Sequence, residues 1–394
     1  MPDAAPPLDP PAPVFSPLHD IHVAAGASFT DFAGWQMPVR YSSDLAEHHA
    51  VRTAAAIFDL SHMAELGIRG PEAGALLDHA LAGRLSALSL GQAKYSLLLD
   101  ETGAIIDDVV VYRTGDDEFV VVANAGNHAV AHETLLERSH GFDAAVTDDS
   151  DDTALIAVQG PRALEIVEAT AGLSPAPDAR SLDSLGYYRA QQGSFAGRPV
   201  LVARTGYTGE DGFELYVHTA DAPALWRALV SAGEPFGLVP AGLAARDSLR
   251  LEAGMPLYGH ELGLDTLPAD AGLGRVPNFG KGDFVGRAAL ERASGADAPP
   301  RRVLVGLVGD GKRAARADYE IFADAESAQP IGVVTSGVLS PTLGVPVAMA
   351  YVDPAFAEAA TVLSVDVRSK RLPFTVTTLP FYSRPSTSRK RDRS

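Results

Sequence analysis

The chain has 394 residues, of which 46% are hydrophobic and 21% are charged, and its formal net charge is −18 at pH 7. This composition is typical of a globular protein with two or three domains, and the acidic balance disfavours nucleic-acid binding, which needs a basic surface. The sequence contains neither cysteine nor an apolar run of about eighteen residues, so it predicts no disulfide, no thiol nucleophile and no transmembrane helix.

The two ends of the chain differ from the rest in composition. Residues 1–17 are rich in proline and carry no basic or strongly apolar stretch, so we expect a disordered tail rather than a signal or transit peptide. Together with the lack of cysteine, this favours the cytoplasm. Residues 383–394 are polar and basic, which predicts a second disordered tail.

Between the tails, the first part of the chain alternates helices with short strands. Helical spacing of apolar residues predicts helices, and short runs rich in valine and isoleucine predict strands. In chain order, the sequence predicts helix 43–56, strand 65–69, helix 74–82, strand 119–123, helix 127–139, helix 161–171 and helix 222–232.

The pattern changes after residue 292. Residues 293–300 read Ala-Ser-Gly-Ala-Asp-Ala-Pro-Pro, which is typical of a linker. Short strands follow at 303–307, 331–335 and 347–352, and these predict a small all-β domain.

An acidic pair interrupts what would otherwise be a buried strand at 103–112. Asp107 and Asp108 are followed by Val-Val-Val-Tyr, and successive side chains of a strand point to opposite faces. One carboxylate can therefore face solvent while the other faces a cavity, where burial would raise its pKa and suit it to accept a proton or anchor a hydrogen bond. A β-turn that ends in Asp-Asp is the alternative.

The glycine-rich segment 204–215 is the most informative stretch of the chain. It reads Arg-Thr-Gly-Tyr-Thr-Gly-Glu-Asp-Gly-Phe-Glu-Leu, with glycines three residues apart. Glycine permits tight turns and close approach of other groups, and residues 213–217 alternate as a strand does. Glu214 would then be presented from a rigid element just after a glycine turn. An ordinary hairpin with solvated charges is the alternative reading.

A third segment, 244–254, predicts an amphipathic helix that ends at Gly254 and Pro256. Arg246 and Arg250 are four residues apart and share a face, so together they could bind a carboxylate. A surface helix with a local Asp247 to Arg250 pair is the alternative.

Other candidate sites are weaker. His128 and His132 have the spacing of a metal-binding pair on a helix, but no third ligand is apparent, so we interpret them as surface histidines. The sequence has no Gly-x-Ser-x-Gly elbow and no phosphate-binding glycine loop.

These motifs occur together in one family. From about residue 18 to residue 382 the chain resembles the glycine cleavage system T protein, an aminomethyltransferase that uses tetrahydrofolate. Single landmarks are weak signals, but their joint occurrence in this order is specific. They are Phe32-Ala-Gly-Trp35, Phe58-Asp-Leu-Ser-His-Met63, Tyr95-Ser-Leu, Ile106-Asp-Asp108, Asn124-Ala-Gly126, Gln159-Gly-Pro161, 204–214, Ala245-Arg-Asp-Ser-Leu-Arg250, Lys281-Gly-Asp-Phe284 and Val334-Thr-Ser-Gly337 with Ser340-Pro341.

The resemblance implies a fold and a reaction. It implies an α+β protein in which two interleaved domains of helices and mixed antiparallel sheets occupy residues 18–292, with the second at about 55–150. A C-terminal β-barrel-like domain would span 301–382, and the parts would surround a central folate cavity. The reaction transfers the methylene of an aminomethyl group from the lipoyl arm of the H protein to tetrahydrofolate, and ammonia is released. The implied partners are lipoylated H protein and folate, with no metal, flavin, nucleic acid or membrane.

The resemblance also assigns site residues, position by position. Asp108 is the implied catalytic residue, and Asp107 should matter less because the strand points it to the other face. Aromatic and methionine side chains suit a flat pterin, and a carboxylate can accept paired N–H donors from its aminopyrimidine edge. The implied folate-binding residues are Met63, Tyr95, Tyr112, Asn124, Tyr188, Tyr207, Glu214 and Arg246.

Two positions depart from the family pattern. Arg275 stands where the family usually has a tryptophan, which puts one wall of the folate tunnel in doubt. Thr102-Gly103 replaces a Gly-Gly pair.

Two other functions fit the same fold: a stand-alone tetrahydrofolate-dependent demethylase, and a non-catalytic folate-binding protein. The second usually carries a cysteine in the glycine-rich segment, and this chain has none.

Docking of the H protein poses an electrostatic problem, because lipoyl carrier domains are usually acidic and so is this chain. Docking would need a local basic patch. The candidates are Arg246 with Arg250, Lys281 with Arg287, and the run 312–316 (Lys-Arg-Ala-Ala-Arg), although a solvated face is the simpler reading of each.

Overall fold

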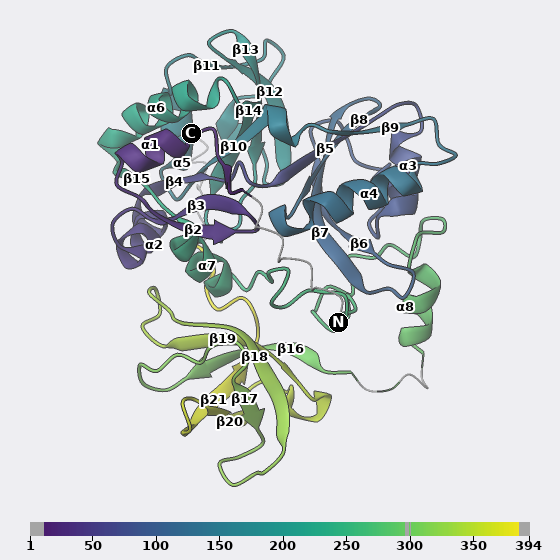
Figure 1. Ribbon diagram of the computed structural model, residues 1–394, viewed down its shortest axis with the longest axis vertical. Helices are drawn as coiled ribbons and strands as arrows, with labels where there is room; N and C mark the ends of the chain where they lie inside the picture. The colour runs from purple at the N-terminus through teal and green to yellow at the C-terminus, as the bar shows by residue number, and fades with distance from the viewer. Residues whose placement is uncertain (1–11, 296–298, 300, 386–394) are drawn as a thin grey trace, which may run out of the picture.

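The computed structural model describes residues 12–295, 299 and 301–385. Two domains of sheet and helix lie side by side, and a β-barrel lies below them (Figure 1). This α+β architecture with a closed C-terminal barrel confirms the expected fold class.

The first domain is built on a seven-stranded sheet with the order β11-β12-β13-β14-β10-β4-β15. Its neighbours pair antiparallel except β15 with β4. Interior strand β4 has no exposed residue: four apolar residues precede Asp59, whose buried carboxylate accepts a hydrogen bond from Ser16. The strands are β4 (Ala55–Asp59), β10 (Thr153–Gln159), β11 (Leu173–Pro175), β12 (Arg189–Phe195), β13 (Arg198–Arg204), β14 (Gly212–His218) and β15 (Leu238–Pro240).

Helices cover this first sheet. Helix α2 begins where the Ser43 side chain accepts a hydrogen bond from the Ala46 N–H, as an N-cap does. Helices α5 and α6 pack against strands β10 and β14 in the main core. The helices are α1 (His19–Ala24), α2 (Asp44–Thr53), α5 (Ala163–Ala169) and α6 (Ala222–Gly233).

The second domain is a five-stranded antiparallel sheet with the order β6-β7-β8-β5-β9. Helices α3 and α4 cover one face and enclose a second core of leucine and valine side chains. The other face looks toward the first domain. The elements are β5 (Ala64–Arg69), β6 (Ala93–Leu99), β7 (Ile105–Gly115), β8 (Glu118–Ala123), β9 (Ala145–Asp148), α3 (Ala73–Ala80) and α4 (His128–Arg138).

Helix α7 (Leu243–Glu252) and the C-terminal barrel complete the molecule. The barrel closes in the order β16-β19-β18-β17-β20-β21, and α7 contacts β18 and β19. A short helix, α8 (Arg287–Ala293), precedes the barrel. The barrel strands are β16 (Val303–Gly309), β17 (Glu320–Phe322), β18 (Pro330–Leu339), β19 (Pro346–Val352), β20 (Val362–Asp366) and β21 (Arg371–Thr377).

The chain ends are more ordered than the composition predicts. A small sheet of β1 (Val14–Phe15), β3 (Trp35–Arg40) and β2 (Ser28–Phe32) lies at the N-terminal side. Part of the predicted tail 1–17 thus forms a strand, which pairs with β3. The next residue, Ser16, is buried and donates a hydrogen bond to Asp59. At the other end, Arg384 pairs with Asp211. Residues 1–11 and 386–394 of the predicted tails lie outside the described residues.

Candidate active site

A cavity of about 330 Å³ lies where the two α/β domains meet helix α7 and the loop after it. Strands β6, β7 and β14, the turn after β4 and the end of β8 all contribute to its wall. The structure brings every predicted site residue to this one cavity. These are Met63, Tyr95, Asp108, Tyr112, Asn124, Tyr188, Tyr207, Glu214 and Arg246.

Strand β7 presents Asp108 to the cavity. Asp108, Val110 and Tyr112 line the cavity, while Asp107 and Val111 do not and Val111 packs into the core under α3 and α4, which is the alternation expected of a strand. The Tyr95 hydroxyl donates to Asp108 Oδ2 at 3.1 Å, and Asn124 Nδ2 donates to Asp108 Oδ1 at 2.8 Å. Burial raises the pKa of Asp108 above its ordinary value, and these two hydrogen bonds offset part of that rise.

The strand pattern would allow Asp107 to face solvent, but in the structure it does not. Its side chain is fully buried because the turn into α4 covers it. Asn124 Nδ2 and Asn127 Nδ2 donate to Asp107 Oδ1 at 2.8 and 2.6 Å, and the Asn124 backbone N–H donates to Oδ2 at 3.1 Å. Burial and the neighbouring Asp108 raise the pKa of Asp107 to about 7.

The glycine-rich segment folds tightly on Gln159. A Cβ at Gly206 would lie 2.0 Å from the side-chain oxygen of Gln159, and a Cβ at Gly212 would lie 2.3 Å from its nitrogen, so neither position admits a side chain. Within the segment, Arg204 donates two hydrogen bonds to the Asp211 carboxylate, from Nε to Oδ1 at 2.9 Å and from Nη2 to Oδ2 at 2.5 Å. This packing fixes the start of β14 and therefore the position of Glu214.

Glu214 sits at one end of the cavity with one carboxylate oxygen already occupied. Thr205 donates to Oε2 at 2.5 Å and Tyr112 donates at 3.4 Å, while Tyr216 donates to the Tyr112 hydroxyl at 3.2 Å. Among the described residues, none donates to Glu214 Oε1. The carboxylate is therefore held by one oxygen and can accept from a ligand with the other.

Arg246 and His62 contribute polar atoms that the protein itself does not satisfy. The Arg246 guanidinium lies over the Tyr207 ring, 5.0 Å from its centroid. Arg246 Nη1 and His62 Nδ1 are buried without a hydrogen-bond partner among the described residues. Burial, and then the charge of Arg246, lower the pKa of His62 to about 4, so its imidazole is neutral near pH 7. Buried polar atoms without partners are uncommon, which marks this wall as a binding surface.

His62 and Phe32 belong to the cavity wall but were not among the predicted site residues. The signal for His62 was its place beside Met63 in the same motif. Phe32 lies at the tip of the hairpin of β2 and β3, and its contact with the His62 ring joins elements that the sequence gives no reason to pair.

The second arginine of α7 has a different role from the one predicted. Arg250 also lines the cavity, but its guanidinium is engaged by protein groups. It donates to Glu261 at 2.9 Å, to Asp247 at 2.8 Å and to Ser336 of the barrel at 2.8 Å. Of the two readings of this helix, the structure shows the local Asp247 to Arg250 pair, although Arg250 is buried rather than on a solvated face.

Arg275 is exposed and is not among the residues that line the cavity. From the same part of the chain, Tyr258 and Leu273 line it. The second departure from the family pattern is Thr102-Gly103, and of these two residues only Gly103 has a positive φ, of 83°. Thr102 replaces a glycine without backbone strain.

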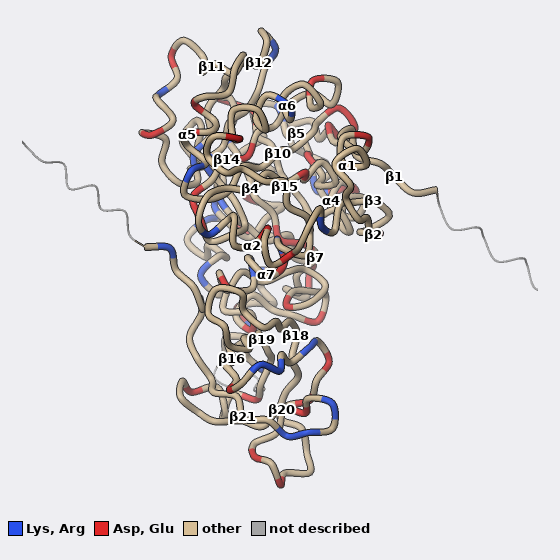
Figure 2. The backbone as a smooth tube through the Cα atoms, turned by 90° about the vertical axis from the view of Figure 1, so that its left-hand side faces the viewer, with Lys and Arg blue, Asp and Glu red and all other residues tan. Residues whose placement is uncertain are grey.

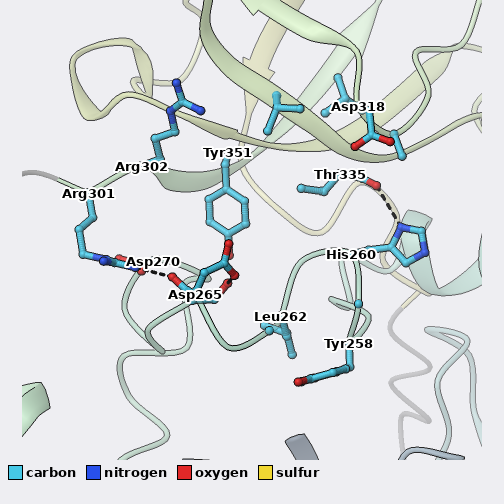
Figure 3. Close-up of a pocket in the computed structure, with 16 residues that line it drawn as sticks. Tyr258, His260, Leu262, Asp265, Asp270, Arg301, Arg302, Asp318, Thr335 and Tyr351 are labelled. Atoms are coloured by element: carbon cyan, nitrogen blue, oxygen red, sulfur yellow. Dashed lines mark hydrogen bonds and ion pairs between the residues drawn. The ribbon is translucent and has the colours of Figure 1, made fainter. Parts of the chain in front are cut away.

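A second, more open hollow of about 750 Å³ lies between the loop 258–270 and the barrel (Figure 3). Tyr258 lines both this hollow and the first cavity. In the hollow, Arg301 donates to Asp270 at 2.7 Å, and His260 Nδ1 lies 3.1 Å from the carbonyl of Thr335.

The described residues include no group of three side chains that could hold a metal ion. His128 Nε2 lies 2.6 Å from Asp148 Oδ2. His128 is therefore paired with a carboxylate, in keeping with its interpretation as a surface histidine rather than a metal ligand. Within the described part of the chain, no helix is both long and apolar enough to cross a membrane.

Comparison with known proteins places this chain in a family. The GCVT N-terminal domain matches residues 18–281, and the glycine cleavage T-protein C-terminal barrel domain matches residues 302–383. The chain is 57% identical to an aminomethyltransferase of Cutibacterium acnes, with 94% of this chain and 98% of that one covered. It is 53% identical to that of Saccharopolyspora erythraea, with coverage of 95% and 99%. The crystal structure of glycine cleavage system aminomethyltransferase T from Bartonella henselae superposes with a TM-score of 0.85 at 36% identity, with coverage of 94% and 98%.

Proposed function

This chain belongs to the glycine cleavage T-protein family of aminomethyltransferases, and from that premise we propose how its cavity performs the reaction. Tetrahydrofolate binds in the cavity around Asp108 and receives the methylene of an aminomethyl group on the lipoyl arm of the H protein. The observation that carries the proposal is one buried carboxylate, Asp108, held by Tyr95 and Asn124 in a cavity with mostly apolar and aromatic walls.

The cavity fits the shape and polarity of a pterin. Its walls carry Met63, Tyr188 and Tyr207, which offer flat or polarizable contacts. At one end, Glu214 has an oxygen free to accept N–H donors, and Arg246 has a free N–H for a carbonyl oxygen. An aminopyrimidinone edge presents donors beside an acceptor, so these two side chains complement it.

Asp108 then has a proton to accept. The aminomethyl nitrogen, which starts protonated as an ammonium group, leaves the carbon as ammonia, and a folate nitrogen bonds to that carbon in its place. The carbon–sulfur bond breaks next, a second folate nitrogen completes the methylene bridge, and the lipoyl sulfur keeps one proton as a thiol. Folate has lost two N–H protons, so one more must be removed, and it ends on ammonia as ammonium. A carboxylate with a raised pKa beside the cavity can relay this proton and can also orient the folate nitrogen.

For the H protein, the structure leaves one of the three candidate basic patches fully on the surface. Arg250 is buried, and the Lys281 amine points inward, donating to the carbonyls of Leu81 and Gly83. Lys312, Arg313 and Arg316 are exposed on the barrel. Basic residues occur there among acidic ones, as the lower end of the molecule in Figure 2 shows. We therefore propose the basic patch Lys312–Arg316 as part of the docking surface for an acidic lipoyl domain.

The other readings of the fold have less support. No described observation favours a demethylase or a non-catalytic folate protein, whereas the curated relatives at 43–57% identity are aminomethyltransferases. We further propose that the enzyme works in the cytoplasm, which suits a chain without cysteine.

A coupled assay tests the proposal. Purified protein is mixed with aminomethylated H protein and tetrahydrofolate, and both ammonia and methylenetetrahydrofolate are measured. We expect stoichiometric formation of the two products. Formation of ammonia without any folate product, or no binding of folate in a calorimetric titration, would reject the proposal.

A further inference from the structure

The two neighbouring carboxylates of β7 are joined by one side chain. Asn124 follows β8 and donates from Nδ2 to Asp107 Oδ1 and to Asp108 Oδ1, both at 2.8 Å, and to the Asp108 carbonyl at 3.2 Å. Asp107 and Asp108 point to opposite faces of the sheet, so Asn124 connects the helix-covered face with the cavity face.

Asp107 fixes the orientation of this amide. It accepts from the Asn124 backbone N–H and side chain on its two oxygens, and Asn127 Nδ2 donates to it as well. If the Asn124 amide rotated by half a turn, its oxygen would face both carboxylates and repel them. The acceptor oxygens of Asp107 thus keep the donor side of Asn124 toward Asp108.

We propose that Asp107 is a positioning residue, which acts through Asn124 to hold Asp108 in place for the reaction. This inference rests on the proposed role of Asp108. The sequence pattern predicted only that Asp107 points away from the cavity and matters less. The hydrogen bonds give it a specific task that burial alone does not.

The variant Asp107→Asn tests this task because it keeps the shape and replaces one acceptor by a donor. Whichever way the new amide turns, its Nδ2 faces a donor, either the side-chain amides of Asn124 and Asn127 or the backbone N–H of Asn124. Either conflict displaces Asn124, and with it the amide that holds Asp108. We expect kcat to fall by about 10- to 100-fold, the range that a displacement of about 1 Å can cause, while the KM for H protein stays the same.

A double-mutant cycle separates positioning from simple destabilisation. If Asp107 acts through Asp108, then Asp107→Asn should lower kcat no further once Asp108 has been changed to asparagine. Asp78→Asn is a matched control, because Asp78 also accepts several hydrogen bonds, from Leu85 and Ser86, but lies on α3 away from the cavity. It should leave kcat unchanged.

The result that would overturn the inference is an equal loss from Asp107→Asn in both backgrounds, or no loss at all. If Asp107→Asn does not fold, Asn127→Ala removes one donor from Asp107 without touching Asp108, and its smaller loss should likewise vanish in the Asp108→Asn background. An unimpaired Asp108→Asn enzyme would instead reject the proposed function of Asp108, so the two failures are distinguishable.

Discussion

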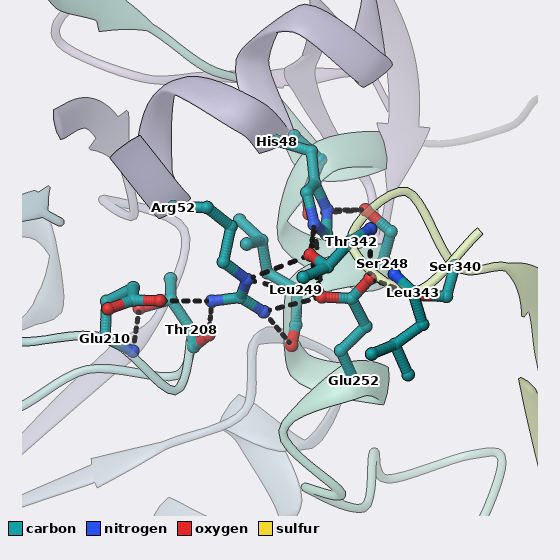
Figure 4. A network of polar contacts seen from close by, with 11 residues as sticks. His48, Arg52, Thr208, Glu210, Ser248, Leu249, Glu252, Ser340, Thr342 and Leu343 are labelled. Atoms are coloured by element: carbon teal, nitrogen blue, oxygen red, sulfur yellow. Dashed lines mark hydrogen bonds and ion pairs between the residues drawn. The ribbon is translucent and has the colours of Figure 1, made fainter. Parts of the chain in front are cut away.

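Helix α7 contributes to two buried polar clusters, which differ in whether their polar atoms find partners within the protein. On one side, Arg246 and its neighbours in the cavity keep polar atoms that no described protein group satisfies. On the other side, Ser248 and Glu252 enter a network with α2 and the barrel in which the charged groups are mutually paired (Figure 4).

The network is a joint between the first domain and the barrel. Glu252 accepts from Arg52 at 2.9 Å, from Ser340 at 2.5 Å and from Thr342 at 2.7 Å, and His48 Nε2 lies 3.1 Å away. Arg52 also donates to Glu210, within the glycine-rich segment. Every one of these contacts joins segments far apart in the sequence. Satisfied polar groups hold a structure together, whereas unsatisfied ones at a cavity mark a place for a ligand.

The carboxyls of the two clusters also have opposite pKa shifts. In the network, burial alone would raise the pKa of Glu252, but hydrogen bonds from His48, Ser340 and Thr342 outweigh it and lower the pKa to about 2. In the cavity wall, burial raises the pKa of Asp108, and directly behind it burial and the neighbouring Asp108 raise the pKa of Asp107 to about 7. The network therefore favours the charged carboxylate, and the cavity wall disfavours it. We expect changes in the cavity to reduce function and changes in the network to reduce stability.

The largest effect should come from the catalytic carboxylate. Asp108→Asn keeps the shape and loses the proton acceptor, so kcat for aminomethyl transfer should fall by about 10²- to 10⁴-fold, the usual contribution of a general acid or base. The melting temperature should stay the same or rise, because a buried charge is removed. Steady-state kinetics and a thermal melt measure the two effects. A melt that collapses together with activity would contradict the division between cavity and network.

The network should show the converse behaviour as a function of pH. The folded pKa of Glu252, about 2, lies below its ordinary value of 4.5. Its contribution to stability is thus fully present above pH 4.5 and is lost as the pH falls toward 2. In wild type this loss should amount to about 3 kcal/mol of unfolding free energy.

Glu252→Gln should remove that part of the acid dependence, lower the stability at pH 7 and leave kcat unchanged in the folded fraction. Urea unfolding at a series of pH values measures it, and Glu291→Gln, an exposed carboxylate on α8, serves as the control. An unaltered pH dependence in Glu252→Gln would mean that the network carboxylate is not the group that titrates.

A smaller effect, on folate affinity, should follow from changing Glu214, whose Oε1 is free to accept a hydrogen bond from a ligand. Glu214→Gln can place an N–H donor where the pterin edge also donates. Leaving a buried donor unpaired costs about 1–3 kcal/mol, so folate affinity should weaken by about 5- to 150-fold. H-protein binding should hardly change. Calorimetric titration of folate beside an H-protein pull-down tests this, and an unchanged folate constant would make Glu214 a purely structural carboxylate.

The sequence predicted the fold class and the set of cavity residues better than it predicted the roles of charges. Alternation along β7 predicted that one carboxylate of the pair faces a cavity, and the family resemblance identified it as Asp108; the glycine spacing of 204–215 reflected the close packing on Gln159. It did not predict that Asn124 bridges two carboxylates, because this depends on the register of β7 with β8.

The charge network was also beyond prediction from the sequence. His48 and Thr342 are 294 residues apart, and no local pattern links them. Arg250 gave a misleading signal for the same reason, since its partners Glu261 and Ser336 come from outside the helix. Local periodicity fixes which face a side chain occupies, whereas its ion-pair partner is decided by tertiary packing.

The smallest effect concerns the surface patch on the barrel, where charges are solvated. Reversal of two charges, Lys312→Glu with Arg313→Glu, should raise the KM for H protein several-fold at low salt and leave kcat and folate affinity unchanged, because exposed charges contribute only about 0.2–1 kcal/mol each. The difference from wild type should shrink as salt rises and screens the charges. The matched control is Arg368→Glu with Lys370→Glu, an equal reversal at another exposed barrel turn. Equal changes in KM for both double variants would mean that only the net charge of the chain matters, and that the patch 312–316 is not a specific docking surface.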